Sequence, residues 1–346
     1  MRLEALDGTA VGGPPARWVG AVLCRDVLGT DGRPALLKGH RLERADALTL
    51  EAAQPGELHL LWLEPGDVDE DTAAMRIARA VAGEHVEVHR PVESQVRLSS
   101  RVRGLLHVDA PALQALNSFD GITVFALPDG VPVDTGKTLA GVKITPLAIA
   151  GDVLDAALAA AVPALMNVRA FLPLRVAVVV RERLSEGERE RFERSLRSKV
   201  TWFGGDVEAI RYVSNDPAAT RTALEESAQR ADVALAVGVA SVDPLDVTWR
   251  SVVDAGAQVV RRGLPVHPGS SYWVVSLHGS PVIGVASCGM FSRRTALDML
   301  LTRCFAGEPL DPAYLASLGH GGLLAAEMAW RFPNYDAAGE APESQP

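Results

Sequence analysis

One apolar run constrains the fold of this chain more than any other feature. Asp232 is followed by Val-Ala-Leu-Ala-Val, and the run ends at Gly238. An uninterrupted apolar run of this kind is typical of a strand that is buried on both faces of a parallel sheet. The loop after it carries Ser241, Asp243 and Asp246. Since ligands of open α/β sheets bind beyond the carboxyl ends of such strands, we predict a binding site at this loop.

The second half of the chain repeats this pattern of apolar runs and amphipathic segments. Strands are predicted at 174–180, 207–213, 233–238, 258–260, 272–277 and 281–286, and helices at 186–203, 217–230, 247–255 and 292–305. Strands that alternate with helices in this way indicate an α/β domain with a mostly parallel sheet. We therefore predict such a domain over residues 172–305.

The first half has a different pattern. A strand-like run at 58–63 between helical patterns at 44–53 and 71–81 predicts a small α+β region over residues 1–85. Short alternating segments separated by glycine and proline predict a β-rich module over residues 86–150, and residues 156–166 are expected to form a linking helix.

The last 41 residues, 306–346, are expected to form a C-terminal extension. Its end, 335–346, is rich in Ala, Gly, Pro, Glu and Ser and has no apolar anchor, which predicts a disordered tail.

Composition excludes several classes of protein. The net charge of −9 over 346 residues argues against a general nucleic-acid binder, which needs a dominant basic face. No apolar run approaches the roughly 18 residues that a membrane span requires, and the N-terminus lacks a signal-like apolar core. Cys24, Cys288 and Cys304 are far apart and predict neither a disulfide framework nor a zinc site. A cytoplasmic protein with reduced thiols is therefore expected.

The loop 238–246 has two interpretations from its residues alone. A strand end followed by a short helix presents free N–H groups to an anion, and Gly238 permits close approach of the backbone. Alternatively, the loop is an ordinary connection in which Asp246 caps the following helix. The residues leave both interpretations open.

Two further groups of residues allow a functional and a structural interpretation. Cys304 shares a helix face with Leu297, Leu300 and Leu301, which predicts a core residue. Arg293 and Arg294 open the last helix of the domain, where they would face either a phosphate or solvent.

The loop resembles a degenerate form of the Gly-Gly-x-Ser-x-Gly-x-x-Asp loop of the molybdopterin-binding domain family. Gly238, Ser241 and Asp246 match that pattern, while Val239 and Asp243 stand at its second and third glycines. Downstream, the turn at Pro268-Gly269 is similar to the family's proline-glycine turn before its next two strands. The resemblance implies a three-layer αβα domain.

A second resemblance covers nearly the whole chain. Segments 37–40, 63–68, 102–108, 116–123, 142–146 and 318–323 resemble the N-terminal half of bacterial proteins that fuse a molybdopterin-binding half to a molybdenum cofactor nucleotidyltransferase-like half. Because the chain ends where that second half would begin, a separate nucleotidyltransferase partner is expected. The resemblance also implies a homo-oligomer, either a dimer or a trimer.

Two segments depart from the family's pattern. The first strand leads into Val180-Arg-Glu-Arg-Leu-Ser-Glu, where the molybdenum-inserting enzymes have Ser-Thr-Gly-Asp-Glu. The strand at 281–286 leads into Ser287, Cys288 and Gly289, where the family has Leu-Pro-Gly-Asn-Pro. These three residues are still candidates to line the pocket, although a buried structural role for Cys288 is the favoured interpretation.

The resemblance implies binding of molybdopterin or adenylylated molybdopterin, and a magnesium-dependent transfer in which molybdenum, supplied as molybdate, replaces the nucleotide. Asp243 and Asp246 are then the candidate catalytic and metal-binding residues. The candidate cofactor-binding residues are Gly238, Ser241, Pro268, Gly269, Ser287, Cys288 and Gly289. Two alternatives to such a molybdotransferase remain: a non-catalytic pterin-binding or scaffold subunit that serves a nucleotidyltransferase or a molybdoenzyme, and a domain that only assembles with partners.

Overall fold

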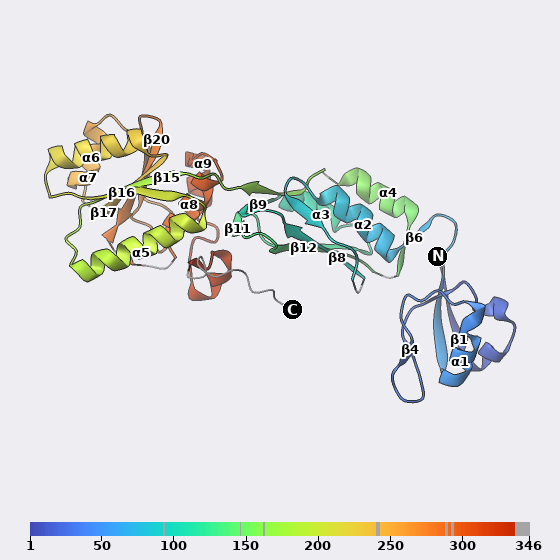
Figure 1. The fold of residues 1–346 in the computed structure, drawn as a ribbon. Coiled ribbons are helices and arrows are strands. Elements are labelled where there is room, and N and C mark those ends of the chain that lie inside the picture. The colour runs from blue at the N-terminus through green and yellow to red at the C-terminus, as the bar shows by residue number, and fades with distance from the viewer. Residues whose placement is uncertain are drawn as a thin grey trace. The chain divides into compact units, whose positions relative to one another are not determined.

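The computed structural model describes residues 1–92, 94–145, 147–161, 163–239, 243–287, 290–291 and 294–335 (Figure 1). The chain divides into two compact units. The first unit contains residues 1–101, 107–129 and 135–167, and the second unit contains residues 102–106, 130–134 and 168–346. The second unit is therefore built from three separate stretches of chain. The division into the four segments 1–85, 86–150, 172–305 and 306–346 remains a prediction from the sequence.

The N-terminal part of the first unit is a small antiparallel sheet with a helix. Strands β1 (Arg2–Asp7), β5 (Glu57–Trp62) and β2 (Val22–Leu23) pair in that order, and β3 (Val27–Leu28) pairs with β4 (Pro34–Leu36). Helix α1 (Ala47–Ala53) follows a 3-10 turn at Arg44–Asp46, and two further 3-10 turns lie at Gly8–Gly12 and Pro15–Arg17. Trp18, Leu50 and Leu60 are fully buried in the core between these elements.

The remainder of the first unit is rich in strands. Its main sheet has the order β10 (Ile122–Ala126), β12 (Thr138–Ile144), β8 (Gln95–Ser100) and β7 (Val86–Val88), and α2 (Glu70–Val81) packs on it. Strand β6 (Asp67–Asp69) pairs with β13 (Ala148–Ala150). A further sheet, whose residues 104–106, 131–133 and 168–170 belong to the second unit, has the order β11 (Val131–Val133), β9 (Gly104–Val108) and β14 (Met166–Ala170).

Two helices in this region differ from the sequence prediction. The predicted range of the linking helix, 156–166, is wrong: α4 spans Gly151–Ala160, and Met166 begins a strand. Pro163 explains the early end, since proline lacks the N–H that continues a helix. Helix α3 (Ala110–Leu116) was not predicted; Asp109 caps it by accepting a hydrogen bond from the Ala112 N–H at 2.9 Å.

The second unit contains the predicted α/β sheet. Six strands lie in the order β16 (Asp206–Tyr212), β15 (Arg175–Val180), β17 (Val233–Val239), β20 (Ser280–Ala286), β19 (Trp273–Leu277) and β18 (Gln258–Arg262). The first four are parallel, and β19 and β18 join them in antiparallel pairs. The run after Asp232 is buried at every position from Val233 to Val239.

Helices cover both faces of this sheet. Helices α5 (Glu186–Trp202) and α8 (Ala296–Phe305) pack on Val178 and Leu235, while α6 (Pro217–Arg230) and α7 (Val247–Asp254) pack on the alternate residues of the same strands (Figure 1). The fold is thus a three-layer αβα sandwich with a mostly parallel sheet. Helix α9 (Pro312–Ser317) and a 3-10 turn at Ala326–Arg331 follow it.

The start of α8 is a capping box. The helix begins at Ala296 rather than at the predicted residue 292, because Thr295 is its N-cap and the Asp298 carboxylate accepts a hydrogen bond from the Thr295 N–H at 2.7 Å. The other oxygen of Asp298 accepts hydrogen bonds from Lys199 Nζ and from the Tyr335 hydroxyl, each at 2.7 Å. Asp298 is fully buried, so these donors hold a carboxylate inside the protein.

Cys304 is a core residue, as predicted. It is buried on α8, and this burial raises the pKa of its thiol to about 12. Within the described ranges, no helix is both long and apolar enough to cross a membrane.

Candidate functional site at the strand ends

Strand β17, whose carboxyl end leads into the predicted binding loop, lies between β15 and β20. Ser241, with its two neighbours 240 and 242, lies outside the described residues. Gly238 has a φ of +85°, and a Cβ at this position would lie 3.0 Å from both the backbone nitrogen and Cβ of Glu182. The strand end therefore requires glycine, because both the backbone conformation and the space exclude a side chain.

Asp246 is the N-cap of α7, which is the structural role that the sequence offered as the alternative to ligand binding. Its Oδ1 accepts hydrogen bonds from the N–H groups of Thr248 at 3.0 Å and Trp249 at 3.1 Å. The side chain is only 3% exposed. A buried carboxylate needs donors and a counter-charge, and the counter-charge comes from the segment after β15.

Arg181, the residue after β15, binds Asp246. Its Nη2 donates to Asp246 Oδ2 and, at 3.2 Å, to the carbonyl oxygen of Gly238. Its Nε donates to Thr248 Oγ1 at 2.7 Å, and Nη1 donates to Asn215 Oδ1 at 3.0 Å. The guanidinium thus joins the ends of β15 and β17, the start of α7 and the segment after β16.

Asp243 has a different environment from Asp246. It is exposed, and its Oδ1 accepts a hydrogen bond from the Leu245 N–H at 2.8 Å, which closes a local turn. Its carbonyl oxygen accepts from Arg262 Nη2 at 3.5 Å, and the Arg262 guanidinium lies 4.6 Å from the ring centroid of Trp249. In the part of the chain that the structure describes, no three His, Cys, Asp or Glu side chains are grouped so as to hold a metal ion.

Ser287 lies at the carboxyl end of β20 and contacts a residue that follows β15. Its hydroxyl donates a hydrogen bond to the carboxylate of Glu182. Because β17 lies between β15 and β20, this pair spans the strand end that carries Gly238. Cys288 and Gly289 lie outside the described residues.

Pro268 and Gly269 pack against the start of α8. The Ala296 N–H donates to the Pro268 carbonyl oxygen at 2.9 Å. Gly269 has a φ of +123°, and a Cβ there would lie 2.5 Å from the Ala296 Cβ. The turn therefore fixes where α8 begins. Arg294 lies just before this helix and is partly exposed, whereas Arg293 lies outside the described residues.

The sequence interpretation missed Arg181 and Glu182. It treated the segment after β15 only as a departure from the family's pattern. A charged pair directly after a strand buried on both faces was the available signal, since such residues lie at the edge where ligands of this fold bind.

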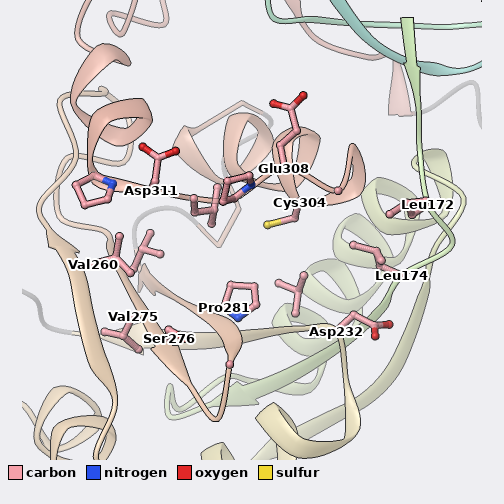
Figure 2. A pocket seen from close by; sticks show the side chains of 17 residues that line it. Leu172, Leu174, Asp232, Val260, Val275, Ser276, Pro281, Cys304, Glu308 and Asp311 are labelled. Carbon is pink, nitrogen blue, oxygen red and sulfur yellow. The ribbon is translucent and has the colours of Figure 1, made fainter.

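A separate cavity of about 580 Å³ lies at the opposite end of the strands (Figure 2). Asp232 and Leu174, which precede β17 and β15, line it together with Cys304 and Pro281. The carboxylates on its wall have partners: Asp232 accepts from the Arg175 N–H at 2.7 Å, and Glu308 pairs with Arg303 at 2.7 Å. This mostly apolar cavity is not part of the candidate loop.

Residues 176–311 match a family described as "Probable molybdopterin binding domain". This segment is a molybdopterin-binding domain. The match runs from the second residue of β15 to the N-cap of α9, so it includes all of β17, the loop 238–246 and α7. The family match links this domain to molybdenum cofactor biosynthesis.

Several solved structures are similar over parts of the chain. The MoeA molybdopterin biosynthesis protein of Pyrococcus horikoshii is 14% identical, with a TM-score of 0.31 over 69% of this chain and 79% of its own. The MoaB molybdopterin biosynthesis enzyme of Thermus thermophilus is 16% identical, with a TM-score of 0.29 over 39% and 98%. A molybdenum cofactor biosynthesis protein of Pyrococcus furiosus is 11% identical, with a TM-score of 0.27 over 89% and 66%.

At these TM-scores, neither a function nor an arrangement of the two units follows from the solved structures. No protein with a curated description matches the chain.

Proposed function

We propose that the molybdopterin-binding domain holds molybdopterin, or its adenylylated form, at the loop 238–246, and that it acts as a pterin-binding subunit in molybdenum cofactor biosynthesis. The family match over 176–311 is the observation that carries this proposal. The loop supports it, because it lies at the strand ends where ligands of this fold bind.

The proposed ligand contacts are made by the groups around the end of β17. Gly238 leaves the strand end without a side chain, and the N-terminus of α7 favours a negative charge nearby. Ser287 and Glu182 offer a hydroxyl and a carboxylate beside it. Ser241, Cys288 and Gly289 remain proposed contacts on the strength of the family resemblance, and Pro268 and Gly269 are proposed as the supporting turn.

A molybdotransferase is the competing proposal, favoured by the match of Gly238 and Asp246 to the family's loop. Its magnesium-dependent step requires Asp243 and Asp246 to hold the ion. Magnesium needs carboxylate oxygens that are directed at it in octahedral geometry. Asp246 does not fit this role, because Arg181 and two backbone N–H groups already bind its oxygens. We therefore favour the non-catalytic subunit, with a nucleotidyltransferase as proposed partner and a homo-oligomer as proposed assembly.

The proposal is tested by measuring the pterin that acid-iodine treatment releases from purified protein supplied with molybdopterin. We expect pterin on the wild type and a loss of about tenfold or more on Asp246→Ala, because the variant removes the N-cap of α7 and the partner of Arg181.

Asp311→Ala is the matched control, since Asp311 caps α9 in the same domain by accepting from the Tyr314 N–H at 2.9 Å. It should keep its pterin. A wild type that takes up no pterin would refute the proposed function, and equal losses in both variants would mean that the loop is not the binding site.

A further inference from the structure

We propose that Arg181 is the positioning residue of this site: its guanidinium supplies, from within the chain, the positive charge beside Asp246, so that a ligand is held between the end of β17 and the start of α7 without a divalent cation. This inference rests on the proposed function only for the identity of the ligand. It concerns the charge balance of the site itself.

The first step is the hydrogen bonding of the Asp246 carboxylate. Oδ1 accepts from two backbone N–H groups of α7, and Oδ2 accepts from Arg181. With its side chain 3% exposed, Asp246 has no broad face towards solvent from which a hydrated ion could approach. A metal ion would have to displace the guanidinium, and the two positive charges would repel each other.

The second step is the hydrogen bonding of the guanidinium. The acceptors are Thr248 Oγ1, Asn215 Oδ1, the Gly238 carbonyl oxygen and the Asp246 carboxylate. They come from three segments of the chain that meet at the strand ends. The planar arrangement of the arginine donors can serve all four acceptors at once, whereas the single ammonium of a lysine cannot. Arg181 therefore fixes both ends of the loop relative to β15.

The third step concerns the other acidic groups nearby. The Asp243 carboxylate closes its own turn with Leu245, and the Glu182 carboxylate accepts the Ser287 hydroxyl. The described side chains thus include no set of three metal-ligating groups at the loop. Since magnesium prefers several oxygen ligands in fixed geometry, the built-in cation is the arrangement that these residues support.

The test combines Mn²⁺ binding, followed by electron paramagnetic resonance, with pterin release in the presence of EDTA or of Mg²⁺. We expect wild type and Asp246→Asn to bind Mn²⁺ equally weakly, and wild type to keep its pterin in EDTA. Arg181→Met should lose pterin by about tenfold or more, with partial recovery in Mg²⁺, because an ion can then reach the carboxylate.

Asn215→Ala is a second variant in case Arg181→Met does not fold. Asn215 is exposed, and its loss removes one acceptor of the guanidinium without opening the core. We expect a several-fold loss of pterin with an unchanged unfolding temperature.

The inference would be overturned if the wild type bound stoichiometric Mn²⁺ and Asp246→Asn abolished this binding. It would also be overturned if EDTA removed the pterin and Mg²⁺ restored it. If the wild type itself takes up no pterin, the proposed function fails, while the Mn²⁺ measurement still decides whether Asp246 binds a cation.

Discussion

Single residues determine the geometry of the strand ends. Gly238 is necessary because Glu182, which follows the neighbouring strand, occupies the space that a side chain would need. Asp246 and Arg181 form an ion pair in which the carboxylate is buried, the guanidinium is largely covered, and each group satisfies several partners. Pairs of this kind contribute little net stability, but removing one member leaves an unpaired charge and is costly. The site therefore tolerates few substitutions at these three positions.

Gly238→Ala should lower the free energy of unfolding by about 2–3 kcal/mol, since it adds a close contact to an unfavourable positive φ. Gly279→Ala is the matched control: Gly279 has the same φ of +85°, and a Cβ there would meet nothing within 4 Å. The control should lose only about 1 kcal/mol of its free energy of unfolding, because only the unfavourable positive φ acts there. Urea unfolding measures both values, and equal losses would show that the contact with Glu182 is unimportant.

At the scale of elements, helix α8 is fixed by charge as well as by apolar packing. Asp298 joins it to α5 through Lys199 and to the C-terminal segment through Tyr335. Desolvation of its hydroxyl, followed by the influence of the Asp298 carboxylate, raises the pKa of Tyr335 well above its ordinary value of 10.0. The neutral phenol is therefore the form that the folded protein stabilises.

Tyr335→Phe should lower the free energy of unfolding by about 1–2 kcal/mol near neutral pH, because it removes a hydrogen bond to a charged group. The stabilisation of the neutral phenol is fully present below the unfolded pKa of about 10 and is lost as the pH rises through the raised folded value. Urea unfolding from about pH 8 to about pH 11 should therefore show a steeper loss in wild type than in the variant. Parallel curves would contradict this role of Tyr335.

The sequence predicted the elements that carry a strong local signal. Asp216 before Pro217 marks the start of α6, and the apolar run after Asp232 marks β17, both as observed. Helix α3 was missed because its short pattern lies among glycine- and proline-rich segments. Arg181 was missed for another reason: its partners come from β17, α7 and the segment after β16, and their proximity depends on a strand order that local patterns do not encode.

At the scale of the whole molecule, the second unit depends on two short stretches that precede it in the sequence. Residues 102–106 and 130–134 belong to it. Within these stretches Arg103 pairs with Asp134, donates to the Trp202 carbonyl oxygen at 2.7 Å, and lies 4.9 Å from the centroid of the Trp202 ring. One side chain thus attaches both stretches to the end of α5.

Arg103→Ala should lower the free energy of unfolding by about 1–2 kcal/mol, through the loss of a hydrogen bond and a cation–π contact. Arg2→Ala is the matched control, because Arg2 lies 5.0 Å from the Trp62 ring and pairs with Glu4, but its side chain is more exposed than that of Arg103. The free energy of unfolding of the control should change by about 0.5 kcal/mol or less. Thermal unfolding followed by tryptophan fluorescence measures the difference, and similar losses would argue against a structural role for Arg103.

The discontinuous second unit has a consequence for inheritance. A recombination event that exchanged only the contiguous stretch from residue 168 onward would leave behind 102–106 and 130–134, and the incoming α5 would meet a foreign Arg103. Productive crossovers must therefore carry the three stretches together, so the two halves of this chain are expected to be inherited as a single block rather than shuffled as independent modules.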